Sequence, residues 1–117
     1  LEFLMTYFES NTISENEKER DYTAILHTLS TWLYSDEKYT EALAVSEKGI
    51  KVCLSYGLLP VFPYLLFNKG SCLMQLNQAE SGKKIIEHAF IFMCELGKYN
   101  DTVVCTQKIK ESFGIDI

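Results

Sequence analysis

The residues of this sequence best suited to metal binding or covalent chemistry are its four cysteines and two histidines. The cysteines, Cys53, Cys72, Cys94 and Cys105, are separated by 19, 22 and 11 residues, so they form no CxxC pair of the kind found in zinc and redox sites. Each stands in an apolar run, where a reduced cysteine behaves as a small hydrophobic residue. We therefore expect four reduced cysteines in a core.

The two histidines and the serines lack the spacing that catalysis requires. Neither His27 nor His88 belongs to an HxxxH or ExxH pair, and the serines have no G-x-S-x-G context. A glycine-rich phosphate loop is also missing from the sequence. These observations predict a domain without a metal, without a cofactor and without enzymatic activity.

The composition is that of one small domain with an acidic surface. The chain has 117 residues, of which 47% are hydrophobic, and this is ample for a packed core. Its formal net charge is −5 and Arg20 is its single arginine, which argues against direct binding to nucleic acid. The longest apolar stretch, residues 58–67, contains two prolines and is too short to cross a bilayer. We expect a cytoplasmic protein and, because the chain begins at Leu1, a fragment whose front part is missing.

Apolar residues at helical spacing predict five helices and no strands. The segment 1–12 is interpreted as the end of a preceding helix. The five predicted helices cover residues 14–34, 39–56, about 59–76, about 80–96 and 100–113. The two prolines of the third can be accommodated only in the loop before it or in its first turn.

Several residues have predicted roles at helix ends or in the core. Ser14 and Glu17 form a capping box, and Gly57 suits the left-handed residue that ends a helix. Asn100 and Asp101 are expected to cap the last helix. Trp32 lies on the apolar side of its helix and is expected in the core. The consecutive apolar residues 89–93 indicate a helix buried on more than one side, by the preceding unit, by the following helix or by a partner subunit.

The helices repeat with a period of 40 residues. A shift of that length superposes Ala42 on Gly82, Gly49 on Ala89, and Gly57 on Gly97. These small residues predict sites where two antiparallel helices touch closely. We divide the chain into repeat one at residues 14–57, repeat two at 58–97 and a terminal helix at 99–117. Because a single hairpin cannot bury its own apolar face, the hairpins are expected to stack.

The spacing within each unit resembles the tetratricopeptide repeat. The matching positions are Leu26, Leu29, Ser30, Leu33, Ala42, Ser46 and Leu54 in the first unit, and Leu66, Lys69, Gly70, Leu73, Gly82, Ile86 and Cys94 in the second. Lys69 replaces an apolar residue, and the period exceeds the usual ~34 residues. The resemblance implies an all-α fold of tetratricopeptide-like helical hairpins that form a short right-handed α-solenoid.

In such a superhelix the first helix of each hairpin lines the concave face, which places a mixed set of amide, hydroxyl and aromatic groups there. The predicted binding residues are His27, Thr31, Tyr34, Tyr64, Phe67, Asn68, Ser71 and Gln75. Their expected neighbours on this face are Thr28, Ser35, Met74, Gln107, Lys108 and Glu111. Asn68 can offer a donor and an acceptor to a peptide backbone, and the aromatic residues can form apolar pockets.

A longer pattern resembles one group of proteins. The segments "YSDEKYTEALAVSEKGIKVCLSYG" and "LLFNKGSCLMQLNQAESGKKIIEHAFIFMCELG" and the ending "KIKESFGIDI" are similar to the C-terminal repeat domain of PlcR-like regulators of Gram-positive bacteria. The resemblance implies a quorum-sensing transcriptional regulator whose repeats bind a short signalling peptide and form a homodimer. DNA would be bound only by a helix-turn-helix domain in the missing N-terminal part.

Two other functions are compatible with the same residues. The repeats can be a general scaffold that binds a segment of another protein and has no role in gene regulation. They can also belong to a Rap-type phosphatase, which has similar repeats, although no phosphatase residues are present. A helix-turn-helix sequence before Leu1 in the parent gene would favour the regulator over the scaffold.

Overall fold

The computed structural model describes residues 15–115, and within them it is all-α. The helices are α2 (Glu15–Ser35), α3 (Tyr39–Tyr56), α4 (Phe62–Gln75), α5 (Ala79–Glu95) and α6 (Tyr99–Phe113). These bounds confirm the five predicted helices to within a few residues. The predicted segment 1–12, the capping serine Ser14 and the last two residues of the predicted terminal helix lie outside the described residues.

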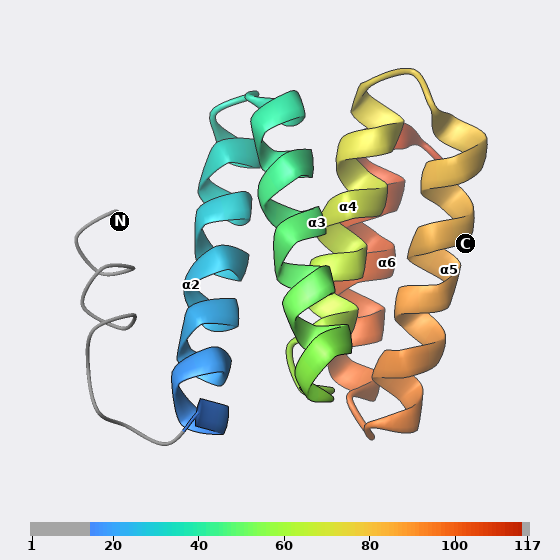
Figure 1. Cartoon of the computed structure of the whole chain (residues 1–117). Helices are drawn as coiled ribbons and strands as arrows, with labels where there is room; N and C mark the ends of the chain where they lie inside the picture. Colours follow the sequence, from blue (N-terminus) through green and yellow to red (C-terminus); the bar gives the residue numbers. More distant parts are fainter. Residues whose placement is uncertain (1–14, 116–117) are drawn as a thin grey trace.

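The five helices pack as adjacent antiparallel hairpins (Figure 1). Helix α2 pairs with α3 and α4 pairs with α5, while α3 lies against α4 and joins the two hairpins. The first helices of the hairpins, α2 and α4, also touch, and α6 follows α5 as the first helix of a further pair. Helix α4 is therefore the central element of the described part. None of the described helices is both long and apolar enough to span a membrane.

The four turns between these helices share one geometry, which recurs every 20 residues. Each contains a residue with positive φ, at Glu37 (61°), Gly57 (66°), Asn77 (65°) and Gly97 (75°). The amide of the next residue donates to a carbonyl five residues earlier in every case: Lys38 to Leu33, Leu58 to Cys53, Gln78 to Leu73, and Lys98 to Met93, at 2.8–3.0 Å. This is the Schellman arrangement that ends a helix. The predicted left-handed conformation of Gly57 is confirmed.

Only one of the four turns is extended. In the other three, the residue after the left-handed position is already the N-cap of the next helix, as at Lys38, Gln78 and Lys98. After Gly57 the chain continues through an extra loop to Val61, and Pro63 stands in the first turn of α4. A missing amide proton costs nothing in that turn. The prolines thus occupy the places that the sequence predicted.

The predicted small residues do lie at close contacts. A Cβ atom on Gly82 would lie 2.6 Å from the carbonyl oxygen of Gly70, and one on Gly70 would lie 2.8 Å from that of Gly82, so the backbones of α4 and α5 touch. Gly49 differs, because its nearest neighbour is the Leu65 side chain of the following hairpin, and Leu26 of its own hairpin is more distant. Ala42 also has no exposed surface.

Several predictions about the core and the caps were wrong. Trp32 is 61% exposed, because the buried line of α2 runs through Thr23, Leu26 and Ser30 on another face. The hydroxyls of Thr23 and Ser30 can be buried there because each donates to a carbonyl of the preceding turn. Cys94 is exposed, whereas the other three cysteines are buried as expected.

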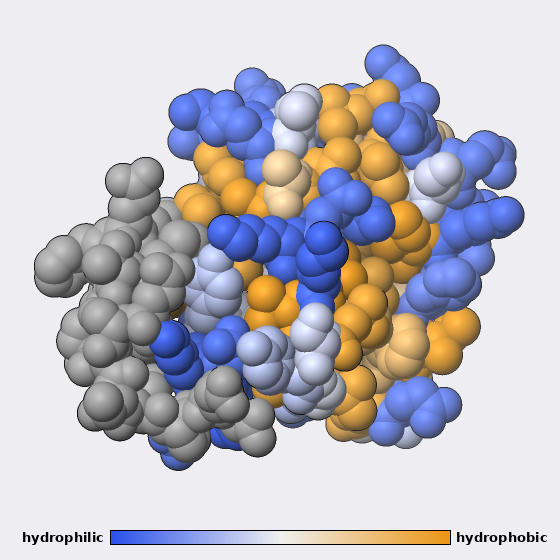
Figure 2. All heavy atoms as spheres, in the orientation of Figure 1, coloured by the Kyte–Doolittle hydropathy of each residue, from blue (hydrophilic) through white to orange (hydrophobic). Residues whose placement is uncertain are grey.

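The outer side of α5 and the start of α6 also differ from the prediction. Ala89, Phe90 and Met93 are buried, but Ile91 and Phe92 are exposed, since five consecutive residues cannot share one face of a helix. Figure 2 shows hydrophobic residues reaching the surface between hydrophilic ones on the side that α3 and α5 present. The N-cap of α6 is Lys98, so Asn100 and Asp101 belong to its first turn instead of capping it.

The contact between Gly70 and Gly82 leads to a prediction about stability. Gly82→Ala gains about 1 kcal/mol of helix propensity, yet its new methyl group meets backbone atoms that cannot move separately. We expect a net destabilisation of about 1–3 kcal/mol, measured as a lower urea midpoint. Gly49→Ala is the matched control, because the atoms in its way belong to the side chain of Leu65 and cost less to displace. Equal effects of the two substitutions would contradict this account.

A second prediction concerns the turns. Glu37 carries a Cβ in the left-handed region, which costs a non-glycine residue about 1–2 kcal/mol, whereas asparagine tolerates this conformation better. Glu37→Gly is therefore expected to stabilise the domain by roughly 0.5–1 kcal/mol and Asn77→Gly by less. Thermal unfolding of both variants would test this order, and the reverse order would count against it.

Candidate functional site

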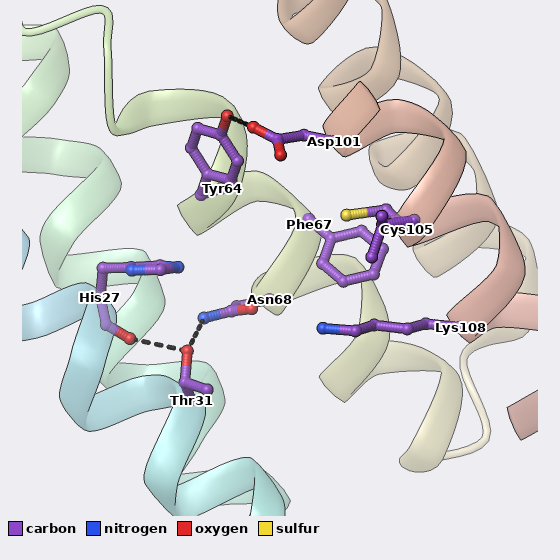
Figure 3. A pocket seen from close by; sticks show the side chains of 9 residues that line it. His27, Thr31, Tyr64, Phe67, Asn68, Asp101, Cys105 and Lys108 are labelled. Carbon is purple, nitrogen blue, oxygen red and sulfur yellow. Dashed lines mark hydrogen bonds between the residues drawn. The ribbon is translucent and has the colours of Figure 1, made fainter. Parts of the chain in front are cut away.

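A hollow of about 230 Å³ lies where α2, α4 and α6 face one another (Figure 3). Its lining is His27 and Thr31 from α2, Tyr64, Phe67 and Asn68 from α4, and Asp101, Val104, Cys105 and Lys108 from α6. The three helices are the first members of successive pairs. The hollow therefore lies on the side of the molecule for which the sequence predicted a binding surface.

A second hollow, of about 130 Å³, continues along the same side. Its lining is Tyr34 from α2, Phe67 and Ser71 from α4, and Lys108, Ile109, Glu111 and Ser112 from α6. Phe67 and Lys108 line both hollows, so together the two form one groove, which we call the α4/α6 groove. The ring of Phe67 stacks on Phe90 of α5 with 6.1 Å between centroids, which anchors it between the two hollows.

The eight residues predicted for binding are brought together on this side. Five line the first hollow: His27, Thr31, Tyr64, Phe67 and Asn68. Tyr34 and Ser71 line the second, and the amide nitrogen of Gln75 donates to the Tyr34 hydroxyl at 3.1 Å. They share a face because on α4 they follow the helical spacing 64, 67, 68, 71 and 75.

The contribution of α6 was predicted only in part. Of the three residues expected there, Lys108 and Glu111 line the groove, while Gln107 lines neither hollow and donates to Glu111 at 3.0 Å. Asp101 and Cys105 were missed as groove residues, Asp101 because it was interpreted as a cap. A further 40-residue step from Tyr64 leads to Val104, so continuing the repeat into α6 would have indicated this wall. Met74, which was expected on the groove, packs beside Gly82 in the core.

The side-chain amide of Asn68 has its orientation determined by two hydroxyl groups. Ser30 and Thr31 both donate their protons to the carbonyl oxygen of His27, at 2.9 and 3.0 Å. Each hydroxyl oxygen can therefore only accept from Asn68, and its amide nitrogen lies 2.7 and 3.1 Å from them. Since the donor end is used within the protein, the amide oxygen is the end that Asn68 offers to a ligand.

Tyr64 connects the two walls of the groove at one end. Its hydroxyl donates to the Oδ2 carboxylate oxygen of Asp101, and the edge-to-face ring contact with His27 has a centroid separation of 6.0 Å. Burial raises the pKa of Tyr64 to about 12, and the hydrogen bond and charge of Asp101 raise it further in the same direction. Tyr64 is thus a proton donor throughout the physiological range.

The α2 and α4 walls of the groove are electrically neutral near pH 7. Burial lowers the pKa of His27 below its ordinary value, which favours the uncharged imidazole. Burial also raises the pKa of Tyr34 and that of Cys105, so neither is an anion. The charged groups of the groove, Asp101, Lys108 and Glu111, all belong to α6. Among residues 15–115, no cluster of histidine, cysteine and acidic residues could hold a metal ion.

Comparisons with protein-family models, with curated proteins and with solved structures each give no match. The chemistry of the groove therefore has to be argued from its own residues. They offer hydrogen-bond acceptors and hydroxyls beside aromatic surface, a combination that suits recognition of a polar backbone carrying apolar side chains.

The bond from Tyr64 to Asp101 predicts a pH dependence. A tyrosine whose folded-state pKa lies above its unfolded value of 10.0 stabilises the fold fully below pH 10, and this contribution is lost as the pH rises from 10 towards 12. We expect the urea midpoint of the native protein to fall more steeply over this range than that of Tyr64→Phe. Parallel curves for the two proteins would show that Tyr64 does not contribute.

Proposed function

We propose that the described helices form two tetratricopeptide-like hairpins and the first helix of a third, in a short right-handed α-solenoid whose α4/α6 groove binds a short signalling peptide. The observation that carries this proposal is the convergence of polar and aromatic residues from three successive first helices on one groove. The 20-residue recurrence of the turns supports the repeat, because it gives successive hairpins the same length.

The size of the groove favours an extended peptide over a compact small molecule. Both hollows are smaller than the ~300–1,000 Å³ of a typical small-molecule pocket. Along α4, Tyr64 at one hollow and Ser71 at the other are seven residues apart, which corresponds to about 10 Å. An extended chain covers that distance in roughly three residues, and its alternate side chains point the same way. Two side chains of one peptide could therefore fill the two hollows.

Asn68 supplies the contact that would hold a peptide backbone. Its amide oxygen can accept a backbone N–H, and this end is available because Ser30 and Thr31 bind the amide nitrogen. The internal hydrogen bonds also fix the rotamer before a ligand arrives, which reduces the entropy that binding has to overcome. Phe67, held against Phe90, gives the peptide an apolar surface beside that acceptor.

At the level of the whole protein, we propose a peptide-responsive transcriptional regulator that acts as a homodimer and binds DNA through a domain preceding this chain. The net charge of −5 supports a sensor that does not itself touch DNA. The exposed apolar side chains Leu59, Ile91, Phe92 and Leu96 line a further hollow on the outer side of α5, and they are the surface we propose for dimerisation.

Peptide binding can be tested with a pool of pentapeptides randomised among alanine, asparagine, leucine, phenylalanine and serine. We expect backbone amide resonances of groove residues, including Phe67 and Asn68, to shift in the NMR spectrum. Asn68→Ala is expected to weaken binding by about 1–2 kcal/mol, roughly 5–30-fold, because a peptide N–H loses its acceptor. Asn100→Ala is the matched control, since Asn100 is exposed on α6 and lines neither hollow.

The regulatory role needs a separate observation. A helix-turn-helix sequence with basic residues on its second helix, encoded directly upstream of Leu1, would support the regulator. Further hairpin repeats in that place, together with binding of the peptide pool, would favour a scaffold that binds segments of other proteins. Sedimentation that gives only monomer at high concentration would remove dimerisation for this chain.

A further inference from the structure

The Tyr64 end of the groove has a charge that the other predicted peptide contacts lack. We propose that the carboxylate of Asp101 receives a cationic nitrogen of the bound peptide and thereby determines which end of the peptide lies at that hollow. This inference rests on the proposed peptide-binding function. It adds the chemical class of the ligand group and the direction in which the ligand lies.

The position of Asp101 makes its carboxylate part of the groove. It lines the first hollow together with His27 and Tyr64, and in Figure 3 its carboxylate meets the Tyr64 hydroxyl across the space between α4 and α6. The bond from Tyr64 occupies one lone pair of Oδ2. A carboxylate has about four acceptor sites, so Asp101 can accept further hydrogen bonds from a ligand. Because Tyr64 holds it in place, the carboxylate is oriented before the ligand arrives.

The charges around the groove distinguish this end from the other. Asp101 and Lys108 are seven residues apart, so they lie on the same side of α6 with about 10 Å between them along the helix. Near Asp101 the groups from α2 and α4 are neutral, because burial disfavours a charged His27 and Tyr64 stays protonated. At the other end, Lys108 and Glu111 of opposite sign both line the second hollow. An ammonium group therefore meets an unopposed carboxylate only at the Tyr64 end.

Two sources can supply the cationic nitrogen: the N-terminus of the peptide or a lysine side chain. The test uses three C-terminally amidated pentapeptide pools, all based on alanine, asparagine, leucine, phenylalanine and serine. The first has a free N-terminus, the second is N-acetylated, and the third is N-acetylated with one lysine added at a random position. Equilibrium dialysis against the full chain, read by mass spectrometry, gives the bound fraction of each pool.

We expect one or both cationic pools to bind roughly three- to tenfold more tightly than the neutral acetylated pool, as for a partly exposed charge-assisted hydrogen bond. A preference for the first pool identifies the peptide N-terminus, and a preference for the third identifies a side chain. Asp101→Asn, which can still accept the Tyr64 hydroxyl, should abolish the preference. Glu87→Gln, an exposed position on α5 outside the groove, should retain it.

Tyr64→Phe separates the charge of Asp101 from its structural role. Without the tyrosine hydroxyl the carboxylate has more acceptor sites for the ligand, so the preference for cationic pools should persist or increase. Equal binding of all three pools, or a preference that survives Asp101→Asn, would overturn this assignment while leaving the peptide groove in place. Failure of every pool to shift the groove resonances would instead overturn the proposed peptide-binding function.

Discussion

The left-handed residue that ends each helix is the constraint on which the rest of the described structure depends. It recurs at positions 37, 57, 77 and 97, so one hairpin is always 40 residues long. A constant hairpin length gives α2, α4 and α6 the same relation to their partners and turns equivalent residues to the same side. Thr28, Asn68 and Lys108 are related by this 40-residue step. A groove composed of first helices is a direct consequence of that regularity.

Much of the fold could be predicted from the sequence because these turns have clear signals. Gly57 and Gly97 mark two helix ends, and the prolines mark the one extended connection. The other two ends are occupied by Glu37 and Asn77, and their equivalence becomes visible only through the 40-residue shift. Trp32 was misplaced for a different reason. Its size and apolar character suggested the core, whereas α2 buries the small hydroxyl residues Thr23 and Ser30, whose polarity is satisfied by the backbone of their own helix.

The groove could be predicted as a face but not as an arrangement of hydrogen bonds. Helical periodicity was sufficient to place Asn68 beside α2, yet it could not tell which end of the amide is used. That depends on Ser30 and Thr31 sharing the His27 carbonyl, a bifurcated contact between side chains and backbone within one helix. Asp101 was missed because an aspartate at a helix start is first interpreted as a cap. Its groove role depends on Tyr64, which is 37 residues away in the sequence and on another helix.

The two sides of α4 explain why a groove forms next to α6 and not next to α5. Towards α5, Gly70 and Gly82 let the two backbones touch, and no space remains between the helices. Towards α6, α4 presents Tyr64 and Phe67, and long aromatic side chains keep the facing helix at a distance. The space between the backbones is then closed at one end by the bond from Tyr64 to Asp101, and remains hollow on either side of Phe67. The pattern of residue size around a single helix therefore determines both where the domain is tightly packed and where it can receive a ligand.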